Sequence, residues 1–255
     1  MKSPLKNSTL ETKAASELLK VIPKGSTVES LNLFTGDLEF SLCEYGNYVT
    51  GVTTRYVIYE FWHCMFENAP RVYDIVNSDN FKFEEDLFIT LQENWAKFKD
   101  QYIRTALFFM LNRCSDTGMI SCGSLSKENY NRVALANLKT FRKPLNFNLL
   151  HTDVNLNEHV ERSTESEFRV VNVGKYNYNL FEYGKSYGLE ETMIHHDKLL
   201  RLLTEKKEKT VLIYNRSNAL LKHEALSSLN VKLINQYGNI TDDPNSTTEV
   251  IIANF

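Results

Sequence analysis

Two stretches of this chain carry residues whose types and spacing could do chemistry. The first is the turn Phe34-Thr35-Gly36-Asp37, which follows a predicted strand. A glycine in such a turn lets backbone amides approach a bound molecule, because no Cβ blocks the approach or the required dihedral angle. The second is the tyrosine-rich tract from Tyr176 to Tyr187. Its rings could stack on nucleic-acid bases, although protein interfaces are also rich in tyrosine.

Basic side chains gather in two short stretches. The first holds Arg132, Lys139, Arg142 and Lys143, and the second holds Lys206, Lys207 and Lys209. Contact with phosphate is one interpretation, and an ordinary solvated face is the alternative that charge runs more often form. The formal net charge of −3 lacks the basic excess that is typical of proteins gripping duplex DNA. Any contact with nucleic acid must therefore be local.

Histidine and cysteine patterns predict no metal site. His195 and His196 are adjacent on a predicted helix, where neighbouring side chains point about 100° apart and cannot share an ion. A solvated surface pair is the prediction for these two residues. Cys114 and Cys122 lack the Cys-x-x-Cys spacing of zinc sites. All four cysteines are expected to be reduced thiols: Cys43, Cys64, Cys114 and Cys122.

Hydrophobic periodicity alternates between strand and helix along most of the chain. Strands are predicted at 27–34, 48–54, 145–151, 168–173, 210–214, 231–236 and 248–253, and helices at 10–21, 56–67, 83–113, 128–140, 191–206 and 219–229. The polar stretch 153–166 has no apolar period and predicts a surface loop. This order favours an α/β fold with a doubly wound Rossmann-like sheet, an antiparallel terminal hairpin and a helical insertion.

Composition sets limits on the class of protein. At 255 residues, with 42% hydrophobic and 24% charged residues, the chain can bury the core of one large α/β domain, with or without an insertion. No run approaches the roughly 18 apolar residues of a membrane span, and the start lacks the apolar region of a signal peptide. A cytoplasmic protein without membrane contact is the expectation.

Several stretches, taken in order, match one known family. They are Lys13, the turn at 33–38 with Ser41-Leu42, the apolar helix at 106–113, the strand at 211–215 and the ending at 248–254. Together they resemble the Dam-like (alpha-class) adenine-specific DNA methyltransferases over nearly the whole chain. The resemblance implies a methyltransferase-like Rossmann core at 1–82 and 141–255, and a helical insertion at 83–140 similar to a target-recognition region. The family is common in bacteriophage, so a phage protein in the host cytoplasm is expected.

The resemblance also implies roles for particular residues. Lys13, Phe34, Gly36 and Asp37 stand where the family holds S-adenosylmethionine, and the Asp37 carboxylate could bond the ammonium group of that cofactor. The basic residues Arg132, Lys139, Arg142 and Lys143 adjoin the insertion that faces DNA in the family. They are therefore candidates for DNA binding through phosphate.

The main departure from the family lies at its catalytic motif. Leu180-Phe181-Glu182-Tyr183 stands where the family has Asp-Pro-Pro-Tyr. Methyl transfer to the adenine amine needs an acceptor side chain and a rigidly held carbonyl to orient the nitrogen, with an aromatic ring stacked on the base. Tyr183 could still stack, and a shifted alignment offers Asn179 or Glu182 as the polar group. Neither shift restores the two prolines.

Two further departures affect binding of the cofactor and of DNA. The second strand, Val49-Thr50-Gly51-Val52-Thr53, contains no acid to accept bonds from the ribose hydroxyls of the cofactor. Loss of such a contact costs about 1.5–3 kcal/mol of binding. The target loop is reduced to residues 115–121, without the family's base-reading arginine.

Two functions remain open. The first is a pseudoenzyme that keeps the methyltransferase fold, needs no cofactor and works as a binding or structural subunit for another protein or for DNA. The second is a divergent, active adenine methyltransferase that uses S-adenosylmethionine. Joint loss of the ribose acid, the catalytic Asp and the target loop favours the first. We also expect Phe181 or a neighbouring aromatic ring to fill part of the pocket around residues 34–38.

Overall fold

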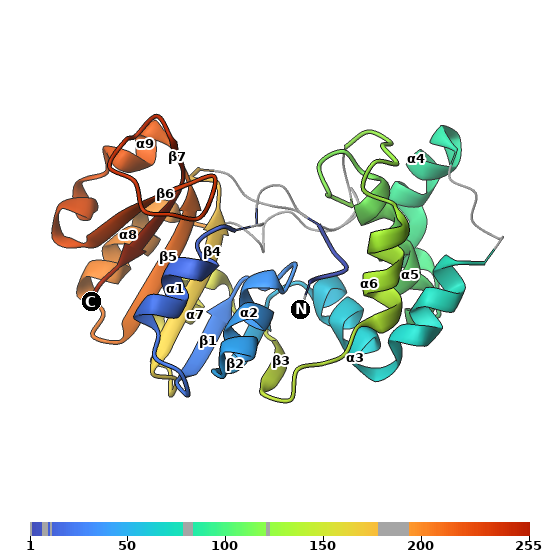
Figure 1. The fold of residues 1–255 in the computed structure, drawn as a ribbon, viewed down its shortest axis with the longest axis horizontal. Helices are drawn as coiled ribbons and strands as arrows, with labels where there is room; N and C mark the ends of the chain where they lie inside the picture. The colour runs from blue at the N-terminus through green and yellow to red at the C-terminus, as the bar shows by residue number, and fades with distance from the viewer. Residues whose placement is uncertain (1, 7–9, 11, 79–83, 121–122, 178–193) are drawn as a thin grey trace.

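The computed structural model describes residues 2–6, 10, 12–78, 84–120, 123–177 and 194–255. Its centre is a seven-stranded sheet with the strand order β3-β2-β1-β4-β5-β7-β6 (Figure 1). The first five strands in this order, from β3 through β2, β1 and β4 to β5, run parallel. Strand β7 pairs antiparallel with both of its neighbours, β5 and β6. The strands are β1 (Thr27–Leu31), β2 (Tyr48–Thr53), β3 (Phe147–His151), β4 (Phe168–Gly174), β5 (Lys209–Asn215), β6 (Asn230–Asn235) and β7 (Thr247–Ala253). The predicted α/β class with an antiparallel terminal hairpin is confirmed.

The central strands are buried on both faces, which explains their apolar sequences. Every residue of β4 is buried, as are five consecutive residues of β5. Val170 and Val211 belong to one core cluster, whereas Val171 and Leu212 belong to a second cluster on the opposite face. Strands covered on both faces need such continuous runs of Val, Leu and Ile rather than an apolar-polar alternation.

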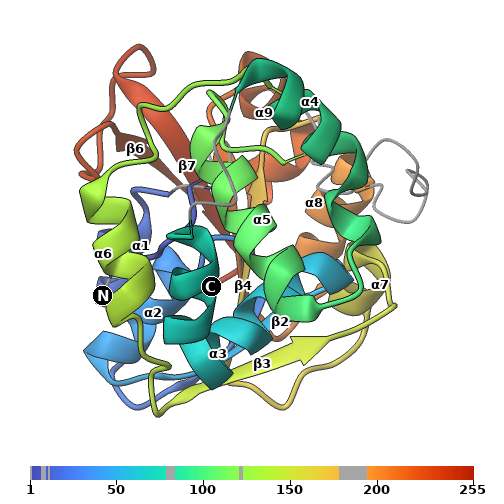
Figure 2. The same cartoon turned by 90° about the vertical axis from the view of Figure 1, so that its right-hand side faces the viewer.

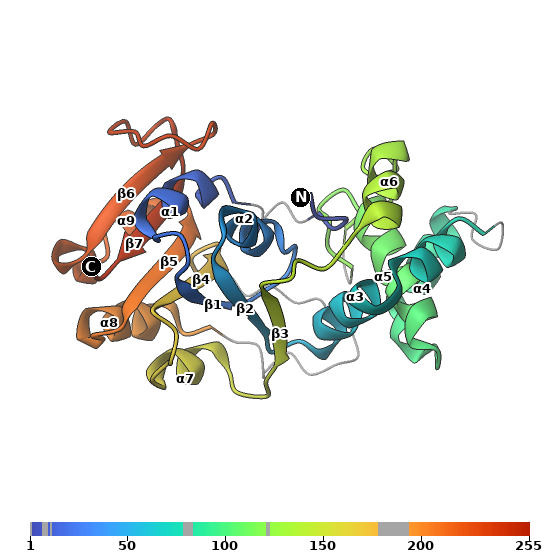
Figure 3. The same ribbon diagram turned by 60° about the horizontal axis from the view of Figure 1, so that its bottom comes forward.

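Helices cover both faces of the sheet (Figures 1 and 3). One face carries α1 (Ala15–Val21) and α2 (Asp37–Tyr45). The other face carries α7 (Leu156–Glu161), α8 (His196–Glu205), α9 (Asn218–Leu221) and the 3-10 helix η3 (Glu224–Ser228). Helix α8 buries Leu199, Leu200 and Leu203, as its amphipathic sequence predicts. The result is a three-layer α/β/α arrangement.

A group of helices forms the connection between β2 and β3 (Figure 2). It comprises α3 (Tyr56–Val76), α4 (Glu85–Asn94), the 3-10 helix η1 (Trp95–Lys97), α5 (Gln101–Cys114) and α6 (Arg132–Thr140). Helix α3 packs against both α5 and α6. It bends at Asn68, whose dihedral angles are not helical, because Pro70 interrupts the hydrogen-bond ladder. None of the described helices combines the length and apolarity needed to cross a membrane.

Aromatic packing holds this helical group together. The rings of Phe61 and Phe108 lie 5.3 Å apart, and those of Trp95 and Phe108 lie 5.5 Å apart. Phe88 and Trp95 are each 1% exposed, so both rings belong to the core, whereas Phe98 is 38% exposed.

Some predicted elements were wrong in extent or kind. The stretch 153–166 contains α7, where the sequence suggested only a loop. Asn155 accepts a bond from the Glu158 backbone amide, and Leu156 and Val160 supply a short apolar face that a longer window overlooks. The first helix starts at Ala15 rather than near residue 10, and the first strand ends at Leu31. The predicted domain boundaries at 82/83 and 140/141 stay predictions.

Candidate functional site

The strand order changes direction between β1 and β4, and this point defines the candidate site. In open α/β sheets, ligands bind beyond the carboxyl ends of the strands where the order reverses. Two asparagines follow these strands, Asn32 after β1 and Asn177 after β4, with φ angles of +64° and +57°. They are the non-glycine residues with positive φ in the described chain. Such backbone conformations concentrate at functional or closely packed sites.

Asn32 links three strands at this edge. Its Nδ2 donates to the carbonyl of Asn172 on β4 at 2.7 Å. Its Oδ1 accepts a bond of 2.8 Å from Nη2 of Arg55, which follows β2. Asparagine tolerates the left-handed conformation better than most residues. The side chain thus binds β1 to its neighbours on both sides.

Arg55 lies two residues beyond the end of β2, the strand that would carry a ribose-binding acid under the family resemblance. It is 2% exposed, and its guanidinium carbon lies 5.6 Å from the centre of the Phe34 ring. A guanidinium carries only donors and has no acceptor for hydroxyl hydrogens. The sequence of β2 contains no acid, and the structure places a buried cation just beyond this strand. A cation does not suit a ribose diol clamp.

The glycine turn packs against aromatic rings. Gly36 has a φ of +77°, and a Cβ on it would lie 2.5 Å from Phe40 and 3.1 Å from Trp62. Trp62 Nε1 donates to the carbonyl of Phe34 at 2.8 Å. Phe40 and Trp62 fill the space beside the turn, and the expectation that Phe181 or a neighbouring ring does so stays a prediction. Phe181, the residue named in that expectation, lies outside the described residues.

The N-terminal segment lies across the same edge, between the sheet and the helical group (Figure 1). Asp37 accepts a 2.9 Å bond from the Ser3 amide, so this carboxylate is engaged by the chain itself. Arg113 donates to the carbonyl of Pro4 at 2.6 Å. Glu249 accepts bonds from the amides of Lys13 and Ala14 and from the Thr12 hydroxyl. Residues 3–4 and residues 12–14 are thus each bonded to the rest of the chain.

The four predicted cofactor residues divide into two pairs. Lys13 and Asp37 both line a polar groove of about 610 Å³, whereas Phe34 and Gly36 are buried. Among the described residues, the groove is also lined by Lys2, Ser3, Leu5, Lys6, Thr12, Arg113, Asn129, Asn131, Val133, Ala134 and Asn137. The groove therefore lies between the N-terminal segment and the start of α6, and it carries more cations than carboxylates.

A cluster of rings follows β4 and β5. The Tyr176 hydroxyl donates to Asp197 at 2.6 Å, and the Tyr176 ring packs edge-on against His196 and Tyr214. Burial, followed by the bond to Asp197, raises the pKa of Tyr176 to about 12. His196 is 5% exposed and its Nδ1 lies 3.3 Å from the Tyr214 hydroxyl, so the predicted surface pair with His195 was wrong. The inward side of α8 was visible in its leucine spacing, but the histidine was not assigned to it.

The predicted catalytic residues Leu180, Phe181, Glu182 and Tyr183 lie outside the described residues. Among the described residues, Asn177 and residues 194–198 line a pocket of about 680 Å³. In the shortened target loop, Gly118 has a φ of +75° and its carbonyl accepts a bond from Asn112. Within the described chain, no three His, Cys, Asp or Glu side chains come together as metal ligands.

The cysteines with described positions are free thiols in the core. Cys43, Cys64 and Cys114 are buried, which confirms the prediction for these three. Burial raises the pKa of Cys43 and of Cys114 to about 12. Thiols of this kind are poor nucleophiles at neutral pH.

The predicted DNA-binding residues lie on α6 and on the segment that leads from it to β3. All four are exposed: Arg132, Lys139, Arg142 and Lys143. Lys139 Nζ lies 5.0 Å from the centre of the Tyr73 ring, and Lys143 Nζ lies 5.3 Å from that of Phe66. These aromatic partners could not be predicted from the basic stretch itself, because they belong to α3.

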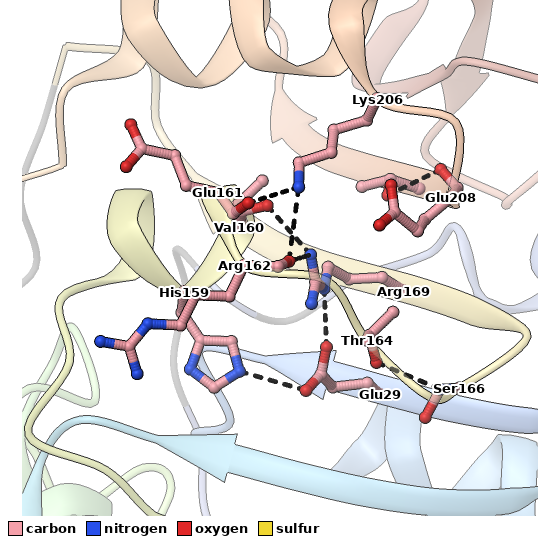
Figure 4. Close-up of polar contacts among 11 residues, drawn as sticks. Glu29, His159, Val160, Glu161, Arg162, Thr164, Ser166, Arg169, Lys206 and Glu208 are labelled. Carbon is pink, nitrogen blue, oxygen red and sulfur yellow. Dashed lines mark hydrogen bonds and ion pairs between the residues drawn. The ribbon is translucent and has the colours of Figure 1, made fainter.

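Sequence reasoning missed a buried charged cluster on the α7 side of the sheet (Figure 4). Arg169 on β4 is 0% exposed and donates to Glu29 on β1 at 2.6 Å. Arg169 also donates to the carbonyls of Val160 and Arg162, and His159 Nε2 lies 3.1 Å from Glu29. Burial favours a higher pKa for Glu29, but the bonds from His159 and Arg169 and the Arg169 charge lower it to about 2. The sequence contained one signal of this cluster: Glu29 and Arg169 are charged residues inside two otherwise uncharged predicted strands.

Comparisons with known proteins do not place the chain in a family. No family model matches the sequence, and no curated protein matches it. Among solved structures, the chain is similar to a Pyrococcus horikoshii protein described as a "putative RNA methyltransferase", with 12% sequence identity and a TM-score of 0.34. The match covers 94% of this chain and 80% of that one. Similarity at this level leaves the activity to be judged from sheet topology and side-chain contacts.

Proposed function

We propose that this chain is a methyltransferase-like protein that has lost methyl transfer and acts by binding another macromolecule. The sheet supports the first part, because it has the doubly wound order and the antiparallel terminal hairpin that the Dam-like resemblance implies. The likeness to adenine-specific DNA methyltransferases in particular rests on the sequence motifs.

The buried Arg55 is the observation that carries the loss of cofactor chemistry. S-adenosylmethionine presents a ribose diol, which a carboxylate at the end of β2 would hold by accepting both hydroxyl hydrogens. Arg55 cannot accept either hydrogen, and it is bonded to Asn32. On the other side of β1, Phe40 and Trp62 fill the space beside Gly36. The residues present therefore do not fit the cofactor.

An active, divergent adenine methyltransferase is the second candidate. The 610 Å³ groove favours it, because Lys13 and Asp37 share this groove as the family resemblance requires. Under this alternative, S-adenosylmethionine would bind with its charged end between these two side chains.

Calorimetry separates the two functions. Titration of the full chain with S-adenosylmethionine is expected to give no binding heat. Incubation with tritiated cofactor and adenine-containing DNA is expected to transfer no label. Saturable heat together with labelled adenine would overturn the proposal and establish the enzyme. Saturable heat without transfer would also contradict the loss of cofactor binding, and Asp37→Ala would then show whether the heat comes from the groove.

A further inference from the structure

One side of α3 carries a line of aromatic and imidazole rings at the surface, here called the ring track: Tyr56, Tyr59, His63 and Phe66. Their spacing of three, four and three residues places them on one face of the helix. The rings of Tyr56 and Tyr59 lie 6.1 Å apart. Those of Tyr59 and His63 lie 5.7 Å apart and within 8° of parallel. His151 at the end of β3 extends the track, 5.7 Å from Tyr56.

The ring track is distinct from the core face of the same helix. Ile58, Phe61 and Met65 are buried at 2% exposure or less. In contrast, Tyr56 is 53% exposed and the His63 side chain is 42% exposed. Phe66 is half-buried and packs on Trp62 and Phe147, so it joins the track to the core. The exposed rings of the track are available for contact with another molecule, because the helix already has a full apolar face.

Cations line the continuation of the ring track. The segment from α6 to β3 runs alongside α3 (Figure 3). This segment brings the amino group of Lys143 over Phe66, and the last turn of α6 brings that of Lys139 over Tyr73. Arg142 is exposed between them. From Tyr56 to Phe66, before the bend at Asn68, the helix extends over about 15 Å. Glu67 is the carboxylate next to the rings, and it pairs with His63 at 3.4 Å.

We propose that this surface binds single-stranded nucleic acid. Lysine and arginine contact the phosphates of such strands while exposed rings stack on successive bases. The phosphates would follow Lys139, Arg142 and Lys143, and the bases would stack along the ring track. A duplex hides the faces of its bases, so rings arranged in this way suit an unpaired strand. Single-stranded nucleic acid would be the macromolecular partner in the binding role proposed above, and the proposal rests on that role.

The proposal also explains how a protein with a formal charge of −3 binds a polyanion. Lys139, Arg142 and Lys143 lie within five residues of one another and are all exposed. Screening at physiological salt limits each charge to a range of about 8 Å, so the local balance decides.

Fluorescence anisotropy of the full chain with a labelled oligonucleotide of about 12 nucleotides tests the surface. Single-stranded RNA, single-stranded DNA and a duplex are compared between about 50 and 200 mM salt. The double variant K139E/K143E is expected to bind at least about tenfold more weakly. Because two phosphate contacts are lost, the slope of log binding constant against log salt concentration should become shallower by about 1.4. K207E/K209E is the matched control, because Lys209 also lies over a ring, 5.0 Å from the centre of Phe168, on a remote strand. It is expected to change affinity by less than about twofold.

Tyr56 tests stacking separately from charge. Tyr56→Ala is expected to weaken binding about tenfold, whereas Tyr56→Phe keeps the ring and should stay within about twofold. The RNA and DNA arms show which strand is preferred, and binding to either supports the proposal. Preference for the duplex, equal loss in K139E/K143E and its control, or no binding to any oligonucleotide would overturn it. None of these results bears on S-adenosylmethionine binding, so the proposed loss of cofactor chemistry fails or stands independently.

Discussion

The middle of strand β1 and its carboxyl end are fixed by different kinds of interaction. In the middle of the strand, Glu29 forms a buried ion pair with Arg169 and a further contact with His159. Beyond its carboxyl end, Asn32 uses a neutral amide to bind Arg55 and the backbone of β4. The first interaction depends on the ionised state of a carboxylate, and the second does not. Charge holds the layers of the fold together, whereas a neutral amide closes the edge at which a ligand would enter.

Removal of Arg169 should have the largest effect. Arg169→Met leaves the Glu29 carboxylate in the sheet without its main partner, at an expected cost of about 3–5 kcal/mol in the free energy of unfolding. The double variant E29Q/R169M removes both charges and should recover much of that loss. Urea denaturation measures each value. If Arg169→Met and E29Q/R169M are equally unstable, the loss of stability does not come from an uncompensated charge on Glu29.

Arg71 provides the control for this experiment. It also pairs with a carboxylate, that of Asp100, at 3.2 Å, but both side chains are at least 42% exposed. Arg71→Met should cost no more than about 1 kcal/mol, because water screens the pair.

The pH dependence of stability comes next in size. Ionised Glu29 has a pKa of about 2 in the fold, lower than the ordinary value of 4.5, so the stability it contributes is present above pH 4.5 and is lost as the pH falls toward 2. The amount is about 3 kcal/mol. Glu29→Gln should remove this component, so the two stability curves should differ above pH 4.5 and converge near pH 2. Parallel curves would show that another carboxylate is responsible.

Buried Glu39 and Glu249 act in the opposite direction and must be separated from Glu29. Burial raises the pKa of both carboxyls, although Ser30 donates to Glu39 and the start of α1 donates to Glu249. A raised carboxyl pKa means that the fold binds more protons, so this contribution weakens as the pH rises. The difference between wild type and Glu29→Gln cancels both groups.

At the carboxyl end of β1, Arg55→Met should have an intermediate effect. The Oδ1 of Asn32 loses its donor from the guanidinium, at a cost of about 1–3 kcal/mol. The loss should be the same at pH 4 and pH 7 within about 0.5 kcal/mol, in contrast to Glu29→Gln. Denaturation at both pH values measures it. A loss confined to one pH would mean that Arg55 pairs with an ionised group. The carboxyl end of β1 would then depend on charge in the same way as Glu29 does in the middle of the strand.

The sequence predicted the layers of the fold better than the contacts of the site. Continuous apolar runs such as 210–214 and the leucine spacing of α8 determine burial locally, so the sheet and its covering helices could be predicted. The missing acid in β2 was also visible. However, the arginine that fills its place lies two residues beyond the strand, and its partner Asn32 lies 23 residues earlier. A single sequence does not show such pairings.

The ring track illustrates the same limit in another way. The positions of Tyr56, Tyr59 and His63 were read as parts of a helix, and the lysines at 139 and 143 were read as a separate basic stretch. Only the packing of α6 and β3 against α3 brings these two sets to one surface. Helix–helix contacts between distant segments depend on the whole core, which periodicity in a single helix does not specify.

The backbone at Asn32 should give the smallest and most specific effect. Asn32→Ala and Asn32→Gly both remove the amide that bonds Arg55 and β4. Alanine must also adopt a φ of +64°, which costs about 1 kcal/mol more than glycine does in the left-handed region. Asn32→Gly should therefore be the more stable of the two by about 1 kcal/mol in urea denaturation, with no change between pH 4 and pH 7. Equal stabilities would mean that the turn after β1 relaxes when the amide is lost. The left-handed conformation would then be a consequence of the contact with Arg55 rather than a constraint imposed by the glycine turn that follows it.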